Sequence, residues 1–365
     1  MHFSLNQIAS IEVNTYKIPT DLPESDGTYV WDHTIMILVT VSGGGKSGIG
    51  YTYGNEVIAP YIQNKLASLI VGKDILDIEY LHNLMFRQIR NDGNCGIAYM
   101  AISAMDIALW DLKARILELP LASLLGKASE SIAIYGSGGF TSYDNNQLTQ
   151  QFEQWAKEGI QYMKMKIGRE PKQDIDRIKT AKTAIGNNTL FVDANGAYTV
   201  KQALKMAEEF IKYDVQWYEE PVSSDNTDGL HFIRAHTPAC INISAGEYGY
   251  TLSYFKKMLE AQAVDVLQAD ITRCGGVTGF LKAGHLCQAF GIPFSSHCAP
   301  ALHANVATAL PNFYIAEYFH DHVRIENEFF DGMPAPTNGR LFPNSDKYGL
   351  GLELKTHDVV KYRIK

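Results

Sequence analysis

From about residue 130 onward, short apolar runs alternate with longer stretches whose apolar residues recur at helical spacing. We expect strands in the apolar runs at 131–136, 161–167, 189–193, 215–219, 241–245, 264–269, 292–296 and 314–317. We expect helices between them at 146–158, 173–185, 200–213, 227–236, 252–260, 276–290 and 303–310. This alternation predicts an α/β fold, a parallel (β/α) barrel. A doubly wound open sheet would require a glycine-rich phosphate turn after its first strand, and residues 135–140 lack that spacing.

The first 125 residues have a different pattern. Strand-like runs at 8–16, 34–41 and 47–53 precede helical stretches, the last of which, 98–117, is strongly apolar. The glycines at 43–45 predict a turn between the second and third runs. The tail after about residue 330 is rich in Gly, Pro and Asn and ends in an alternating run at 359–364. We therefore expect an α+β unit in residues 1–125 and a barrel in residues 126–330.

Composition excludes several classes of protein. The chain has 365 residues, with 32 Lys and Arg against 40 Asp and Glu, and the net charge of −8 disfavours a nucleic-acid partner. No apolar run approaches the roughly 18 residues of a membrane helix, so we expect no membrane partner. The N-terminus lacks the pattern of a signal peptide. Five scattered cysteines without a CxxC pair are typical of a reduced protein, and we expect a cytoplasmic location.

Ionisable side chains occupy the C-terminal end of every predicted barrel strand from the second to the eighth, which is where barrels of this type place their functional groups. The second strand ends in Lys164 and Lys166, and their alternation places both on one face. The later strands end in Asp193 with Asn195, Glu219 with Glu220, Glu247, Asp270, His297 and Glu317. Any one of these residues alone would be explained by capping, solvation or packing. Seven occupied strand ends in succession exceed what packing requires.

A cluster of carboxylates without compensation repels itself. Three acidic residues on neighbouring strands are most simply reconciled by a hard divalent cation, with Asp193, Glu219 and Glu247 as oxygen ligands. Mg²⁺ suits such a site, and Mn²⁺ would bind similarly. The choice of Glu219 over Glu220 depends on strand register, which the sequence leaves open.

The remaining strand-end residues predict acid–base chemistry. Two lysines beside a cation would have lowered pKa values, because like charges disfavour protonation, and Lys166 could then act as a base. Asp270 and His297 predict a dyad in which the carboxylate orients the imidazole. Two bases flanking a cation that holds a carboxylate are suited to removing the proton α to that carboxylate. Lys164, and Glu317 in its protonated form, would stabilise the enediolate.

Two other classes of function remain open. A Schiff-base aldolase could use Lys164 or Lys166 as its nucleophile, but it would not need three carboxylates on successive strands. A barrel retained only for binding or structure would be expected to have lost catalytic positions, and here all are filled.

The set Lys-x-Lys, Asp-x-Asn, Glu-Glu-Pro, Gly-Glu, Asp, Ser-Ser-His and Glu, in this order and spacing, resembles the enolase superfamily, most closely its mandelate racemase subgroup. The segment AISAMDIALWDL at 101–112 is similar to the helix that precedes the barrel in that family. The resemblance covers essentially the whole chain. It implies a modified (β/α)7β TIM-type barrel that binds Mg²⁺, under a capping domain that the C-terminal tail, residues 331–365, completes.

By the same matching, the resemblance implies a role for each motif residue. Asp193, Glu219 and Glu247 become the metal ligands. The catalytic groups become Lys166 as one base, Lys164 as its electrophilic partner, His297 with Asp270 as the other acid/base, and Glu317 as donor to the substrate carboxylate; Asn195 belongs to the same set. The muconate lactonizing subgroup would carry a lysine where this chain has Asp270.

The family includes racemases, epimerases, cycloisomerases and acid-sugar dehydratases, and its specificity is thought to reside in two loops of the cap. Here these loops would be residues 20–33 and 51–57, which carry the aromatic and hydrogen-bonding residues Asp21, Glu24, Ser25, Asp26, Tyr29, Trp31, His33, Tyr51, Tyr53, Asn55 and Glu56 but no Arg or Lys. Such a lid suits hydroxyl groups and offers little to a second carboxylate. We therefore expect dehydration of a sugar acid with one carboxylate to a 2-keto-3-deoxy acid; a second carboxylate clamped by Arg273 or Arg324 would count against this.

Racemisation, epimerisation or cycloisomerisation with the same lysine and histidine bases is the alternative. Members of the family commonly form homo-oligomers, which we also expect here. The run His320-Asp321-His322 could hold a second metal, but a solvated loop after the eighth strand is the simpler interpretation.

Overall fold

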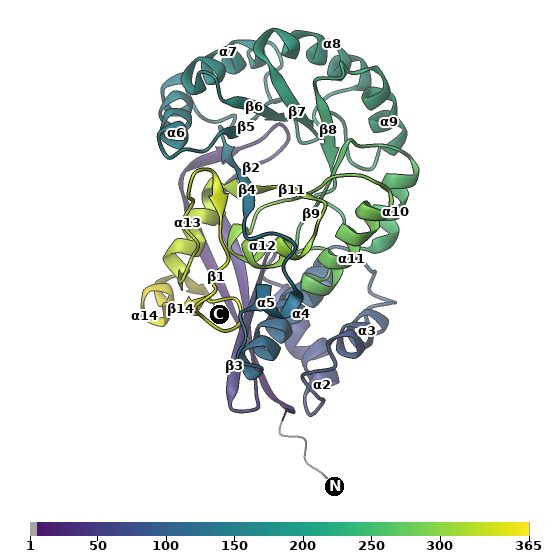
Figure 1. Cartoon of the computed structure of the whole chain (residues 1–365), viewed down its shortest axis with the longest axis vertical. Coiled ribbons are helices and arrows are strands. Elements are labelled where there is room, and N and C mark those ends of the chain that lie inside the picture. The colour runs from purple at the N-terminus through teal and green to yellow at the C-terminus, as the bar shows by residue number, and fades with distance from the viewer. Residues whose placement is uncertain (1–5, 365) are drawn as a thin grey trace.

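The computed structural model describes residues 6–364, and within them eight parallel strands close into a barrel. The barrel closes because the last strand pairs with the first, with Glu317 opposite Tyr135. Figure 1 shows the barrel in the upper part of the molecule, with its helices around the outside. The strands are β4 (Ile132–Gly138), β5 (Tyr162–Lys166), β6 (Thr189–Asp193), β7 (Val215–Glu219), β8 (Asn242–Ala245), β9 (Val266–Ala269), β10 (Phe294–Ser296) and β11 (Phe313–Phe319). The predicted barrel is confirmed.

The helices between these strands bury one apolar face against the sheet, and several of them begin at good capping residues. Asp144 and Thr199 each form a capping box, with Gln147 and Gln202 respectively, which satisfies backbone N–H groups at the first turn. The helices are α6 (Asn145–Lys157), α7 (Asp174–Ile185), α8 (Val200–Phe210), α9 (Thr227–His236), α10 (Leu252–Glu260), α11 (Gly276–Ala289) and α12 (Pro300–Val306). Among the described residues, no helix combines the length and the apolar character that crossing a membrane requires.

One further helix follows the last barrel strand, and the sequence interpretation missed it. Helix α13 (His320–Phe329) begins directly after β11, so the expected solvated loop at residues 320–322 is wrong. Its buried face includes His322, Ile325 and Phe329, which recur at helical spacing. The helix packs beside the cap rather than returning to the outer ring, and it forms part of the contact between barrel and cap.

The cap is built on an antiparallel sheet covered by helices. Its strands are β1 (Ile8–Ser25), β2 (Val30–Gly43) and β3 (Lys46–Tyr53), and its helices are α1 (Ile58–Tyr61), the π-helical turn 62–66, α2 (Ala67–Ile70), α3 (Ile78–Gln88), α4 (Ile97–Ile116) and α5 (Leu121–Leu125). The apolar helix α4 lies directly on β3. A Cβ atom on Gly48 would come within 2.3 Å of the backbone nitrogen of Leu112, so this close packing requires glycine.

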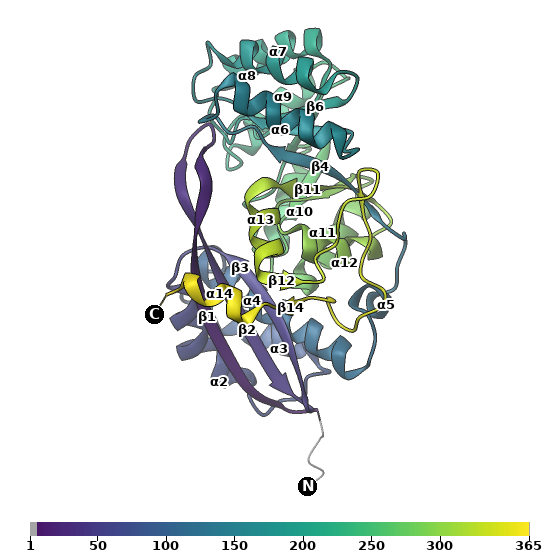
Figure 2. The same cartoon turned by 90° about the vertical axis from the view of Figure 1, so that its left-hand side faces the viewer.

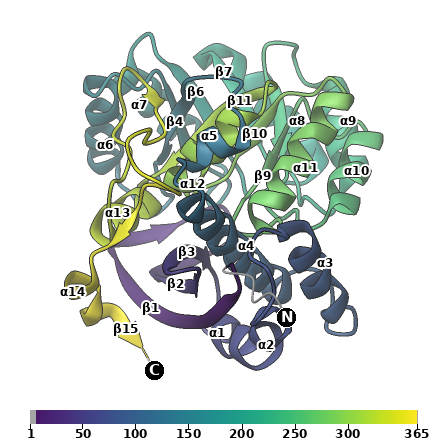
Figure 3. The same cartoon turned by 60° about the horizontal axis from the view of Figure 1, so that its bottom comes forward.

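The tail returns to the cap. Strand β15 (Arg363–Ile364) pairs with β1 and gives the sheet order β15-β1-β2-β3, as Figure 3 shows. The alternating run at 359–364 is a strand only at its end, because residues 356–362 form two helical turns. The buried carboxylate of Asp111 on α4 accepts backbone N–H groups from Ile49 at 2.8 Å and Leu350 at 2.6 Å. A single side chain thus joins the cap sheet, α4 and the tail.

The expected loop at residues 20–33 is instead a long β-hairpin. Strand β1 continues to Ser25, across an irregularity between Pro19 and Glu24, and β2 already begins at Val30. Figure 2 shows this ribbon rising from the cap beside the barrel. The turn is closed by Asp26, whose Oδ1 accepts the backbone N–H groups of Thr28 and Tyr29 at 2.6 and 2.7 Å. The prediction of a loop fails because the hairpin is held by contacts with distant parts of the chain.

Three contacts fix the hairpin on the barrel. Arg169, in the segment after β5, donates to the carbonyls of Asp26 and Tyr29 at 2.9 and 2.7 Å. Thr141, in the segment after β4, donates from its hydroxyl to the Asp26 carbonyl at 2.8 Å. A Cβ atom on Gly27 would come within 2.5 Å of the carbonyl oxygen of Ala194. The turn therefore lies directly against the carboxyl ends of the barrel strands.

Candidate active site

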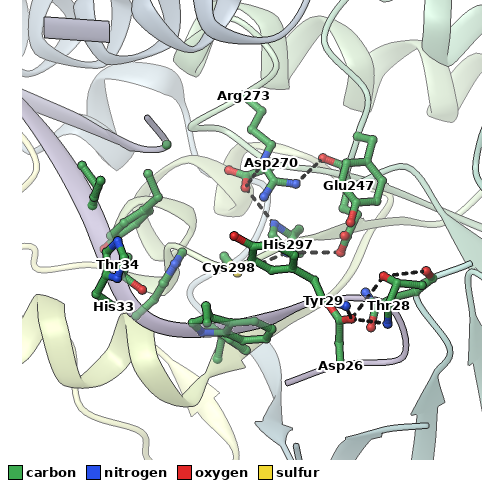
Figure 4. A pocket seen from close by; sticks show the side chains of 18 of the residues that line it. Asp26, Thr28, Tyr29, His33, Thr34, Glu247, Asp270, Arg273, His297 and Cys298 are labelled. Atoms are coloured by element: carbon green, nitrogen blue, oxygen red, sulfur yellow. Dashed lines mark hydrogen bonds and ion pairs between the residues drawn. The ribbon is translucent and has the colours of Figure 1, made fainter. Parts of the chain in front are cut away.

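The carboxyl ends of the barrel strands and the cap hairpin enclose a cavity of about 570 Å³ (Figure 4). The nine residues that the sequence singled out meet here and are joined in one continuous network of hydrogen bonds and ion pairs. Lys166, Asn195, Glu247, Asp270 and His297 line the cavity. The other four, Lys164, Asp193, Glu219 and Glu317, are fully buried beneath it.

The three carboxylates on β6, β7 and the segment after β8 form a compact group. One carboxylate oxygen from each of Asp193, Glu219 and Glu247 lies within 4.8 Å of the other two. The register pairs Asp193 with Glu219, so Glu219 rather than Glu220 belongs to this group. Glu220 points elsewhere and lines a neighbouring cavity. This donor set consists only of buried carboxylate oxygens, which is the chemistry that a hard divalent cation such as Mg²⁺ requires.

The two lysines of β5 reach this group from one side. Lys166 Nζ lies 2.5 Å from Asp193 Oδ2. Lys164 Nζ lies 2.5 Å from Glu219 Oε1 and 2.8 Å from Glu317 Oε1. Burial alone would lower the pKa of Lys164, but the carboxylates together outweigh it and hold that pKa well above its ordinary value.

Burial alone would also lower the pKa of Lys166, but the neighbouring carboxylates, Asp193 above all, outweigh it and raise that pKa. Sequence reasoning expected both values to be lowered beside a bound cation. Where no cation is bound, the charges of the carboxylates outweigh that of the neighbouring lysine.

On the opposite side, His297 lies between two carboxylates. Its Nδ1 is 2.7 Å from Asp270 Oδ2, and its Nε2 is 3.1 Å from Glu247 Oε2. The other oxygen of Asp270 accepts the backbone N–H and the hydroxyl of Thr272, both at 2.7 Å. Burial would raise the pKa of Asp270, but the hydrogen bond and charge of His297, and then Arg273, lower it below its ordinary value. The dyad is therefore an ionised carboxylate that orients an imidazole toward the cavity.

Glu317 lies between Lys164, at 2.8 Å, and His297, at 3.8 Å. Its Oε1 accepts the Ser137 hydroxyl at 2.6 Å, and its Oε2 accepts the backbone N–H of Cys298 at 2.8 Å. Burial would raise the pKa of Glu317, but Lys164 and then His297 hold it well below its ordinary value. This favours the ionised carboxylate over the protonated form that sequence reasoning considered.

The wall opposite the barrel strands, which we call the roof, comes mainly from the cap. Six of the expected lid residues line the cavity: Asp26, Tyr29, Trp31, His33, Tyr53 and Asn55. Two other residues of the expected lid do not line the cavity themselves. The carboxylate of Glu24 accepts the Trp31 indole N–H at 2.6 Å, and the Tyr51 hydroxyl donates to Glu326 on α13 at 2.6 Å. The lining contributed by the cap is mainly polar and aromatic and contains no Arg or Lys.

Two basic side chains complete the cavity. Arg273, which follows β9, donates to the Glu247 carbonyl at 3.0 Å and lies over the Tyr248 ring. His322 stacks on Tyr53 with ring centroids 3.6 Å apart. Sequence reasoning missed His322 because it did not predict α13; the apolar spacing of residues 325 and 329 was the available signal. Arg324 is absent from the cavity lining and pairs with Asp321 at 2.5 Å.

Comparison with known families covers most of the chain. Residues 11–126 match the family "Mandelate racemase / muconate lactonizing enzyme, N-terminal domain", and residues 147–359 match "Enolase C-terminal domain-like".

Two curated relatives have named activities. The chain is 30% identical to an L-talarate/galactarate dehydratase of Salmonella typhimurium, over 88% of this chain and 80% of that protein. It is 29% identical to a 3,6-anhydro-alpha-L-galactonate cycloisomerase of Streptomyces coelicolor, over 84% of this chain and 86% of that protein.

Solved structures agree with this assignment. A mandelate racemase/muconate lactonizing enzyme-like protein from Rubrobacter xylanophilus superposes with a TM-score of 0.96 at 48% identity, covering 98% of this chain and 100% of that one. A racemase from Streptomyces coelicolor, crystallised with bound magnesium, superposes with a TM-score of 0.92 at 28% identity, with the same coverage of both chains. The barrel, the cap and both domain matches together show that this chain belongs to the enolase superfamily, in its mandelate racemase subgroup.

Proposed function

We propose that this protein uses Mg²⁺ to remove the proton α to the carboxylate of a sugar acid and dehydrates that acid to a 2-keto-3-deoxy product. The observation that carries the proposal is the placement of two proton-transfer groups on opposite sides of one acidic triad. Lys166 contacts Asp193 at one side, and His297 contacts Glu247 at the other. Both line the same cavity, so a substrate bound at the triad would lie between them.

Asp193, Glu219 and Glu247 would hold the cation, which when bound supplies Lewis-acid polarisation of the substrate carboxylate. Mn²⁺ could replace Mg²⁺ at such a site. Relatives support this assignment, since the racemase named above was crystallised with magnesium.

The residues of the chain perform the proton transfers. One of Lys166 and His297 removes the α-proton, and the charge that develops on the carboxylate oxygens is stabilised by the Lys164 ammonium. The other group donates a proton to the β-hydroxyl, which leaves as water, and the resulting enol tautomerises to the 2-keto acid. Asp270 keeps the His297 imidazole oriented. Glu317 and Asn195 would help to position the substrate.

The cavity supports a hydroxylated substrate. Its roof presents the indole, phenol, imidazole and amide groups of Trp31, Tyr29, His33 and Asn55, which suit several hydroxyl groups. Arg273 in the barrel wall is already engaged with Asp270, at 3.5 Å, and with Tyr248. The substrate panel should therefore contain sugar acids with one carboxylate, which we favour, and with two.

The test is proton NMR in D₂O with enzyme, Mg²⁺ and a panel of sugar acids, with a parallel series in EDTA. Loss of the α-proton together with a 2-keto-3-deoxy product, abolished by EDTA, would establish the dehydratase. Exchange of the α-proton without loss of water would overturn dehydration in favour of racemisation or epimerisation. An isomeric ring-opened or lactone product would favour a cycloisomerase, the activity of one relative named above.

Two further properties belong to this proposal. All five cysteines are free thiols, which supports a reducing, cytoplasmic location. We also propose that the protein forms a homo-oligomer, as expected from its family, which sedimentation of the purified chain would test.

A further inference from the structure

A second group of potential metal ligands lies outside the cavity, where β1 meets the start of α13. Asp21 and Glu24 belong to β1, and His320 is the first residue of α13. His320 Nε2 lies 2.9 Å from Asp21 Oδ2, and a carboxylate oxygen of Glu24 is within 4.8 Å of the ligand atoms of both. Two ligands of one tetrahedral cation, each about 2 Å from it, are roughly 3.3 Å apart. The Asp21–His320 distance is thus close to the spacing that a shared cation would impose, and Glu24 lies near enough to complete the group after a small adjustment.

Glu24 supplies an independent indication of a missing ligand. Its side chain is fully buried, and its Oε2 accepts the Trp31 indole N–H. Its Oε1 has no hydrogen-bond partner among residues 6–364. A buried carboxyl oxygen without a partner is costly, and a cation at this point would satisfy it.

The neighbouring charges do not satisfy Glu24. Asp321 is engaged by the Thr34 hydroxyl at 2.6 Å and by Arg324, so it adds negative charge without offering a donor. Arg324 also donates to the Pro19 carbonyl at 2.7 Å. The Arg324 guanidinium is therefore already engaged by Asp321 and by the Pro19 carbonyl, while the side chains of Asp21 and His320 are partly exposed to solvent.

We propose that Asp21, Glu24 and His320 form a second divalent-cation site, of a type suited to Zn²⁺, that joins the cap hairpin to α13. One imidazole nitrogen with two carboxylate oxygens is a common zinc donor set, and the partial exposure of Asp21 and His320 leaves room for water as a further ligand. The acidic triad in the barrel offers oxygen ligands only, so the two sites differ in the cations they favour.

The position of this site gives it a structural consequence. Glu24 holds Trp31, which lines the cavity and packs edge-on against Phe140. A cation bridging β1 and α13 would hold the base of the hairpin and the Trp31 indole together. The proposal does not depend on which reaction the barrel catalyses.

The experiment counts Zn²⁺ bound by the metal-free protein in calorimetric titrations, and follows the histidine rings by ¹⁵N NMR. The His320 resonance is assigned by its absence in His320→Ala. Asp21→Asn is the main test, because Asp21 is partly exposed and its amide replacement keeps the shape. His285→Ala, an exposed histidine on α11, is the matched control. Asp193→Asn disables the barrel triad, so that the two sites are counted separately.

We expect Asp21→Asn and His320→Ala each to bind one equivalent of Zn²⁺ fewer than the wild type, and His285→Ala to bind the same number. We expect the His320 resonance to shift on addition of Zn²⁺ in Asp193→Asn as well as in the wild type. Equal binding by the wild type and both cluster variants, with an unmoved His320 resonance, would overturn the proposal. Failure of the barrel triad to bind Mg²⁺ would instead contradict the proposed function.

Discussion

The two walls of the cavity are built on different physical principles. The barrel wall, which we call the floor, consists mainly of charged side chains on or directly after strands, such as Lys166 and His297. They rest on fully buried side chains, such as Lys164 and Glu219, that are held by several partners. The roof is formed mainly by one hairpin, whose tip residues Tyr29 and Val30 are 66% and 56% exposed. Reactions that need fixed geometry benefit from the first design, and recognition of variable substrates benefits from the second. The comparison predicts that substitutions in the floor lower kcat, whereas substitutions in the roof raise KM.

The largest effect is expected from the floor. Lys166→Ala and His297→Asn should each lower kcat for dehydration by roughly 10²- to 10⁴-fold, because each removes a proton-transfer group. Far-ultraviolet circular dichroism should remain that of the wild type. Exchange of the α-proton with solvent, measured by NMR in each variant, will show which group removes it. Full activity in either variant would refute the assignment of two bases.

Removal of the metal tests the floor without a mutation. Dialysis against EDTA should abolish turnover, and added Mg²⁺ should restore it, because three buried carboxylates within 4.8 Å of one another would otherwise face the substrate carboxylate directly. The Asp193→Asn variant should not recover on addition of Mg²⁺ at concentrations that restore the wild type. Undiminished turnover after exhaustive chelation would contradict the metal-dependent mechanism.

In the roof, Trp31→Phe should raise KM about 10-fold and change kcat little. The substitution keeps an aromatic ring but removes the indole N–H that Glu24 accepts, at a cost of roughly 1–3 kcal/mol for a buried carboxyl left without that donor. Steady-state kinetics with several sugar acids will measure the effect. Phe232→Leu, an exposed aromatic on α9, serves as the control. A fall in kcat as large as that of the floor variants would show that the two walls are not separable.

A smaller effect, on stability, is expected at the contact between α13 and the cap sheet, where the carboxyl of Glu326 on α13 accepts the Tyr51 hydroxyl of β3. Burial raises the pKa of Glu326 to about 8 from an ordinary value of 4.5, although hydrogen bonds from Tyr51 and Ala301 oppose it. The folded state therefore holds a proton that the unfolded state releases between pH 4.5 and 8. The stability from this group is complete below about pH 4.5 and is lost as the pH rises through about 8.

Glu326→Gln keeps the hydrogen-bonding shape and removes the titration. Relative to the wild type, its free energy of unfolding should rise as pH increases from 5 to 8, by at most about 1.4 kcal/mol per pH unit. Urea denaturation at four pH values will measure the difference. A difference that stays constant with pH would show that Glu326 is ionised in the folded protein.

The contrast between the walls also explains what the sequence could predict. The floor follows from local rules, because strand periodicity and residue type place Lys166, Asp193 and His297 at strand ends without knowledge of other contacts. The choice between Glu219 and Glu220 required the register between β6 and β7, which only the folded sheet provides.

The roof could not be derived in this way. Residues 20–33 contain a proline, a glycine and several polar residues, which locally favour a loop. They form a hairpin because Arg169 and Thr141 bind its turn from the barrel. His322 was missed for a related reason, since it lines the cavity from α13, a helix that the sequence interpretation did not include.

The hairpin also bears on how the substrate specificity of such proteins can change. The cap lines the cavity largely through a single uninterrupted stretch of chain, residues 26–35, whose turn touches the barrel mainly through backbone carbonyls and Gly27. Backbone contacts tolerate replacement of the side chains between them. Exchange of this short segment with a relative would therefore transplant most of the recognition surface in one step, and would leave the machinery for proton transfer as it was.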